Sequence, residues 1–222
     1  MSSFVLKMIA VISMCFDHFG YLISNGSFSW CNILGRLAFP IFAFQISEGY
    51  EHTHNLKKYF WKLFIFALIS QIPFNLFQYV FGFTFSLNIF FTLLLGLAAI
   101  CAFDKIPNKF LGLFVSAIFI YLGYFLNVDY GYWGVLIVFA FYILKKHTLL
   151  TVLGFLALVL FKYIPLLLTY NFHYAYISLA IGTFLSIIPI LLYNGKLGPK
   201  TKYFLYVFYP LHLTIIAIAC LI

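Results

Sequence analysis

Residues 4–24 read FVLKMIAVISMCFDHFGYLIS, an apolar run that nevertheless carries Lys7, Asp17 and His18. A helix needs about 20 mostly apolar residues to cross a bilayer. A charged side chain at its centre costs about 3 kcal/mol on insertion scales. No small-residue cleavage site follows the run, so we expect a retained first membrane helix rather than a signal peptide. Charge kept at such a cost indicates a cavity or a functional site.

The composition of the whole chain extends this interpretation. The 222 residues are 65% hydrophobic and only 8% charged, whereas a soluble domain has about 25% charged residues. The net charge of +8 comes from residues in short loops, which is typical of membrane topology signals and not of nucleic-acid binding. The four cysteines are isolated, so we expect neither a disulfide framework nor a metal site.

The apolar runs predict an all-α fold, a polytopic membrane helix bundle of about nine transmembrane helices in a single domain, residues 1–222. Pro40 is expected to bend the second run. Lys162 and Pro165 split the seventh run and leave its end open, so Lys162 is counted with the loop that follows. The expected runs cover residues 4–24, 31–50, 58–81, 86–103, 109–127, 131–144, 148–168, 173–193 and 203–222.

The lysines alternate between loops in a way that fixes an expected orientation. Ten lysines lie in loops after even-numbered runs, and only Lys162 lies after an odd-numbered run. Because positive residues mark the cytoplasmic side, the N-terminus is expected in the cytoplasm. Twelve lysines against one arginine, with abundant Phe, Ile, Tyr and Asn, are typical of an AT-rich bacterial genome, so the chain is expected in the bacterial cytoplasmic membrane.

Two polar layers follow from this topology. The outer layer is expected to hold Asp17, His18 and Arg36, with Gln71, Asn75, Asn88 and Asp129 on the same half of the membrane. The inner layer holds Lys7, Glu48, His52, His54, Lys57 and Lys58. Lys7 and His18 are eleven residues apart, or about 16 Å along one helix face. A cation and an imidazole on one face predict a cavity that traverses much of the membrane.

Each candidate has a structural alternative beside its functional one. Arg36 either pairs with Asp17 to join two helices or, like Asn88, stabilises an oxyanion. His18 is either a general base or a structural histidine. His212, which follows Pro210 in VFYPLHLTI, either lines the cavity or packs in the bundle. The cluster His52, Lys57 and Lys58 either marks topology or forms, with Lys7, a lip for an anionic donor.

Several blocks of this sequence resemble the TraX family, which is named for the conjugation protein that N-acetylates pilin. They are LKMIAVISMCFDHFG, GRLAFPIFAFQISEGYEHTHNLKKY, SQIPFN, LNIFFTLLLG, DYGYWGVL and YVFYPLHL, spread over residues 6–213. The family is similar in turn to the transmembrane acyltransferase superfamily, whose polysaccharide enzymes carry an arginine, ten residues and a catalytic histidine. Here Lys7 replaces that arginine, which keeps the charge but loses the bidentate fork.

The resemblance implies acetyl transfer from cytoplasmic acetyl-CoA to an amine or hydroxyl acceptor at the outer side, an exported peptide or a surface glycan. Catalysis is expected from His18 with Asp17, without a metal. Substrate or donor contacts are expected from Lys7, Arg36, Glu48, His52, Lys57, Lys58, Asn88 and His212. Two alternatives stay open: a substrate-binding subunit of a transporter for a small metabolite, and a membrane peptidase that uses Cys15 and His18.

Overall fold

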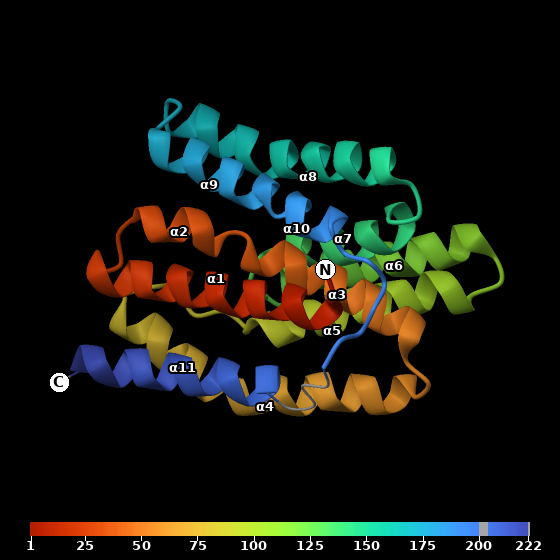
Figure 1. Ribbon diagram of the computed structural model, residues 1–222, viewed down its shortest axis with the longest axis horizontal. Helices are drawn as coiled ribbons and strands as arrows, with labels where there is room; N and C mark the ends of the chain where they lie inside the picture. The colour runs from red at the N-terminus through yellow and green to blue at the C-terminus, as the bar shows by residue number, and fades with distance from the viewer. Residues whose placement is uncertain (200–203, 222) are drawn as a thin grey trace.

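The computed structural model describes residues 1–199 and 204–221, and the regular structure of these residues is helical (Figure 1). One isolated β-bridge joins Leu87 to Val128. The helices are α1 (Ser3–Ile23), α2 (Trp30–Gly35), α3 (Ala38–His52), α4 (Leu56–Val80), α5 (Ile89–Lys105), α6 (Lys109–Phe125), α7 (Gly131–Leu144), α8 (Thr148–Thr169), α9 (Tyr174–Leu185), α10 (Ile187–Leu191) and α11 (Phe204–Leu221).

The predicted all-α membrane bundle is confirmed. Five of the described helical segments are long and apolar enough to cross a membrane: Ser3–Ile23, Leu56–Val80, Thr148–Thr169, Tyr174–Leu191 and Phe204–Leu221. Helices α6 and α7 are shorter but also apolar. The ends of the predicted ninth run, residues 203 and 222, lie outside the described residues.

Two of the predicted runs are interrupted. The second divides into α2 and α3 at Arg36 and Leu37, and the eighth divides into α9 and α10 at Ser186. The expected bend at Pro40 is therefore wrong by about one turn. Pro40 lies in the first turn of α3, where a missing N–H costs no helical hydrogen bond. The seventh run, in contrast, continues through Pro165 to Thr169 as one helix.

Short polar side chains start many of the helices by accepting backbone N–H groups that have no partner inside the helix. Ser2 accepts from the N–H of Val5 at the start of α1, and Asn108 accepts from two N–H groups of α6. Asn55 and Asn88 cap α4 and α5 in the same way. These caps set where the apolar segments begin.

The helices run roughly along one axis and form layers in Figure 1. Helices α8 and α9 lie at one side, α4 and α11 lie at the opposite side, and α1, α2 and α3 lie between them. The last long helix packs against α4 and also touches α1, although they are far apart in sequence. Fully buried Leu6, Ile41, Leu97 and Val138 mark the core. This arrangement brings α1, α3, α4 and α11 around one interior space.

Candidate active site

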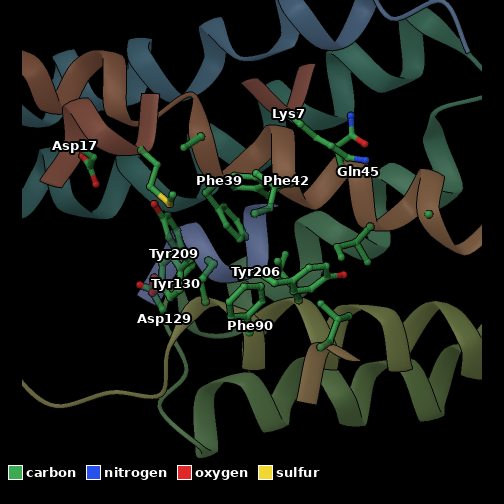
Figure 2. A pocket seen from close by; sticks show the side chains of 18 of the residues that line it. Lys7, Asp17, Phe39, Phe42, Gln45, Phe90, Asp129, Tyr130, Tyr206 and Tyr209 are labelled. Carbon is green, nitrogen blue, oxygen red and sulfur yellow. The ribbon is translucent and has the colours of Figure 1, made fainter. Parts of the chain in front are cut away.

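A cavity of about 850 Å³ lies inside the bundle (Figure 2). Its size is typical of a small-molecule site. Polar groups line both of its ends, and aromatic rings such as Phe39, Phe90 and Tyr209 line the middle. Helix α1 contributes Ser3, Lys7, Met14, Asp17 and His18 to the wall. Lys7 and His18 therefore share one face of α1, about three turns apart.

At the end that we call the His18 end, Asp17 forms an ion pair with Arg36. Arg36 Nη2 donates to both carboxylate oxygens of Asp17, at 2.7 and 2.9 Å, and to the hydroxyl of Tyr21 at 3.0 Å. Asn32 Nδ2 adds a bond to Asp17 Oδ1 at 3.2 Å. Asp17 and Arg36, which were predicted to lie at the same depth in the membrane, thus contact each other directly. Their ion pair joins α1 to the break between α2 and α3. Arg36 Nε is buried and has no partner among the described residues.

The local sequence explains how the chain reaches this geometry. Ser29 and Asn32 form a reciprocal capping box at the start of α2, which fixes the direction of this short helix. Gly35 permits the close approach, because a Cβ there would lie 2.3 Å from the Cβ of Asp17. The helix stops one residue later, so Arg36 lies at its C-terminal end and beside the carboxylate.

His18 has a different partner from its sequence neighbour. Its Nδ1 lies 2.7 Å from Nε2 of His212, and Nδ1 of His212 lies 2.9 Å from the carbonyl oxygen of Phe208. The two imidazole planes are within 20° of parallel, with centroids 4.9 Å apart, and the ring of Phe208 lies nearly parallel to His212 at a centroid distance of 5.1 Å. His212 is 8% exposed and is not a cavity-lining residue. It therefore reaches the site through His18, and its ring also lies 5.6 Å from that of the lining residue Tyr209.

Lys162 is a site residue that the sequence analysis placed in a loop. The structure puts it inside α8 and in the cavity wall. Its Nζ lies 4.1 Å from the ring centroid of Trp133 and 4.7 Å from that of Tyr130, as in cation–π contacts. The assignment of this lysine to a loop is wrong because its aromatic neighbours, not water, accommodate the charge. The sequence signal was available: Phe161 and Tyr163 flank it within an apolar run.

Asp129 lies in the connection between α6 and α7 and also lines the cavity (Figure 2). Its backbone carbonyl accepts from the hydroxyl of Thr92, which ties the connection to α5. Burial raises the pKa of Asp129 to about 6, although Arg36 and Lys162 act in the opposite direction. The carboxyl group therefore titrates near neutral pH and adds a second acid–base group to the wall.

At the opposite end, which we call the Lys7 end, Glu48 is held by a cation from another helix. Lys145 Nζ lies 2.7 Å from Glu48 Oε1 and 3.0 Å from Glu51 Oε2, so the pair joins α3 to α7. Lys7, Glu48 and His52 all line the cavity here. Gln45 and Lys62 are among the lining residues that were not predicted; the hydroxyl of Ser3 donates to Gln45 Oε1 at 2.8 Å.

Four of the expected contact residues do not line the cavity: His212, as described above, and Lys57, Lys58 and Asn88. Lys57 and Lys58 are exposed in the first turn of α4. Asn88 is fully buried, but its side chain caps α5 and donates to the carbonyl of Ala67 at 2.7 Å and to Gln71 at 2.9 Å. The side-chain amide of Asn88 is therefore used in hydrogen bonds within the protein. Cys15, the nucleophile of the peptidase alternative, is likewise not a lining residue.

The arrangement supplies an imidazole at one end of an apolar cavity and a lysine at the other. Among residues 1–199 and 204–221, no group of three or more His, Cys, Asp or Glu side chains is placed to hold a metal ion. The side chains of the wall offer groups for proton transfer and for the binding of anions.

Comparisons with known proteins agree with the residue blocks noted above. The family model described as TraX protein matches residues 2–219. A relative from Dichelobacter nodosus, named as probable fimbrial assembly protein FimC of serogroup H1, is 29% identical over 242 residues. The alignment covers 98% of this chain and 95% of that relative. No solved structure matches.

Proposed function

Because the chain belongs to the TraX family, we propose that it is a membrane acyltransferase that moves an acetyl group from acetyl-CoA to an amine or hydroxyl acceptor. One observation carries the proposal: a single cavity has Lys7 at one end and His18 at the other. The activity after which the family is named, pilin N-acetylation, gives the reaction class. The name of the relative, a fimbrial assembly protein, favours an acceptor at the cell surface.

In the proposed reaction, His18 is the general base. It takes a proton from the acceptor nitrogen or oxygen while the lone pair of that atom attacks the thioester carbonyl. The tetrahedral intermediate then collapses, the C–S bond breaks, and the leaving thiolate receives the proton from the imidazolium. The products are the acetylated acceptor and free CoA, so atoms and charge balance.

The cations of the cavity have separate roles in this proposal. Lys7, with Lys62 nearby in the same wall, attracts the phosphates of acetyl-CoA. Arg36 is largely occupied by Asp17 and Tyr21, so Lys162 is the other cation of the wall that can face a developing oxyanion. Asp17 holds Arg36 and positions α1, and it is not the partner of His18.

The proposed sidedness places the Lys7 end in the cytoplasm and the chain in the bacterial cytoplasmic membrane. Helix α8 tests it, because exposed Lys146 and Tyr170 flank its two ends. In a cysteine-free variant of intact cells, we expect Tyr170→Cys to react with an impermeant maleimide and Lys146→Cys to react only after permeabilisation. The reverse pattern would place acetyl-CoA on the wrong side and overturn the proposed orientation.

The direct test follows radiolabelled acetyl-CoA. The purified protein in liposomes is mixed with a detergent extract of envelopes from cells that lack the gene, and label in polymers and peptides is measured. Mass spectrometry then identifies the acetylated species. We expect label transfer by the wild type and not by liposomes alone. Binding of acetyl-CoA without any transfer would contradict the proposed acetyltransferase activity and favour the alternative of a substrate-binding transporter subunit.

A further inference from the structure

The hydrogen bonds of the His18–His212 pair have a defined direction. A backbone carbonyl only accepts, so the 2.9 Å contact to Phe208 requires a proton on Nδ1 of His212. A neutral imidazole has one N–H, so Nε2 of His212 then carries a lone pair. That lone pair, 2.7 Å away, requires the proton of His18 on Nδ1. The free lone pair of His18 is therefore on Nε2.

If Nε2 of His212 instead donated to Nδ1 of His18, His212 would carry a proton on both nitrogens and a positive charge. His212 is 8% exposed and stacks against Phe208. Within the described part of the chain, no carboxylate lies at ion-pair distance from it; Asp17 is bound to Arg36 instead. A buried charge without a counter-ion is costly, so the neutral form is favoured and the direction of the chain is set.

We propose that His212 is a positioning residue that fixes the tautomer of His18, so that Nε2 of His18 is the atom that receives the acceptor proton. This inference rests on the proposed acyl transfer. His212 does not line the cavity and acts only through His18. Its role corresponds to that of the third group in nucleophile–base–orienter arrangements, here supplied by a second imidazole and a carbonyl. When His18 is protonated on Nε2 during the reaction, its Nδ1–H bond to His212 remains in place.

The neighbouring aromatic rings also hold the orientation of the His18 imidazole. Phe208 lies parallel to His212, with 12° between the ring planes, and His18 lies within 20° of His212. Phe77 closes on His18 from α4 at a centroid distance of 5.0 Å. The imidazole of His18 is thus held in plane as well as in tautomer, which pre-organises the base.

The first test reads the tautomer without any acetyl transfer. Nitrogen NMR of the full chain, labelled with ¹⁵N-histidine and reconstituted in liposomes, is recorded at neutral pH. The spectrum of His18→Gln assigns the His18 signals. We expect a protonated Nδ1 and an unprotonated Nε2 on His18, and loss of this fixed pattern in His212→Phe. A proton on Nε2 of His18 in the wild type would overturn the inference, whether or not the protein is an acetyltransferase.

The second test separates positioning from packing in the labelled acetyl-CoA assay with envelope extract. His212→Phe keeps a stacking ring but removes the acceptor, and we expect turnover to fall roughly 10²–10³-fold with KM for acetyl-CoA unchanged. His212→Gln keeps an oxygen acceptor and should recover to within about tenfold of the wild type. Thr214→Val, on the same helix and outside the cavity, is the matched control with wild-type turnover.

Wild-type turnover in His212→Phe would overturn the positioning role, and so would equal losses in the Phe and Gln variants. If His212→Phe does not fold, the wild-type NMR pattern and the His212→Gln activity decide the question. If the wild type itself transfers no label, the proposed function fails, and the NMR measurement still tests the tautomer on its own.

Discussion

The two ends of the cavity each bring a carboxylate and a cation together, but they leave different groups facing the interior. At the His18 end, Arg36 and Asn32 occupy Asp17, while His18 bonds to His212 from α11. At the Lys7 end, Lys145 occupies Glu48, and Lys7 faces the cavity. The His18 end therefore presents a base, with Lys162 in the same wall, and the other end presents Lys7. Neighbours in sequence, Asp17 and His18, have separate partners and separate roles.

The largest effect is expected from His18→Ala, which removes the base from its end. A general base contributes roughly 10²–10⁴-fold, so label transfer from acetyl-CoA should fall by that factor while acetyl-CoA binding is kept. Cys15→Ala, on the same helix but outside the cavity wall, should keep wild-type turnover. Near-normal transfer by folded His18→Ala would remove the catalytic difference between the two ends.

The next effect concerns stability and compares the two ion pairs. Asp17→Asn leaves the buried Arg36 without its carboxylate and should lower the free energy of unfolding by about 3 kcal/mol. Glu48→Gln should cost only about 1 kcal/mol, because Lys145 keeps Glu51 at 3.0 Å. Denaturant unfolding in detergent micelles measures both. Equal losses in the two variants would show that the second carboxylate does not compensate.

Gly35→Ala tests the close approach that brings Arg36 to Asp17. Since the new Cβ would lie 2.3 Å from the Cβ of Asp17, α1 and α2 must separate, and we expect a loss of about 2 kcal/mol. The melting temperature in micelles checks this. Unchanged stability would mean that the ion pair does not depend on helix contact at this glycine.

The smallest effect is expected at the opposite end. Lys7→Ala should raise KM for acetyl-CoA about tenfold, which corresponds to the loss of one charge-assisted contact, and leave kcat nearly unchanged. Lys57→Ala is the matched control: this lysine is exposed outside the cavity and its loss should leave KM at the wild-type value. A rise in KM for both variants would assign the effect to general attraction of the anion by the surface.

The helices could be predicted from the sequence because long apolar runs are sufficient to identify them. The contact of His18 with His212 could not, since 194 positions separate the two residues and no local pattern records such a pairing. Asn88 was predicted to contact the substrate or donor, although an asparagine directly before the apolar residues that start at Ile89 is an N-cap signal. Lys162 was assigned to a loop because lysine usually marks one; of the rings around it, Tyr163 is its neighbour in sequence, but Tyr130 and Trp133 lie about 30 positions away and no local pattern records their contact.

The distance along the chain between the two histidines has a consequence for biosynthesis. His18 belongs to α1, and His212 belongs to α11, which is translated much later. At about 5–20 residues per second, the 194 positions between them correspond to about 10–40 s of translation. The charge of Asp17 is matched early, by Arg36 only 19 positions later. The nascent chain can therefore pair these two charges in the membrane well before it acquires a positioned base, so the His18–His212 pair forms only after α11 has been translated.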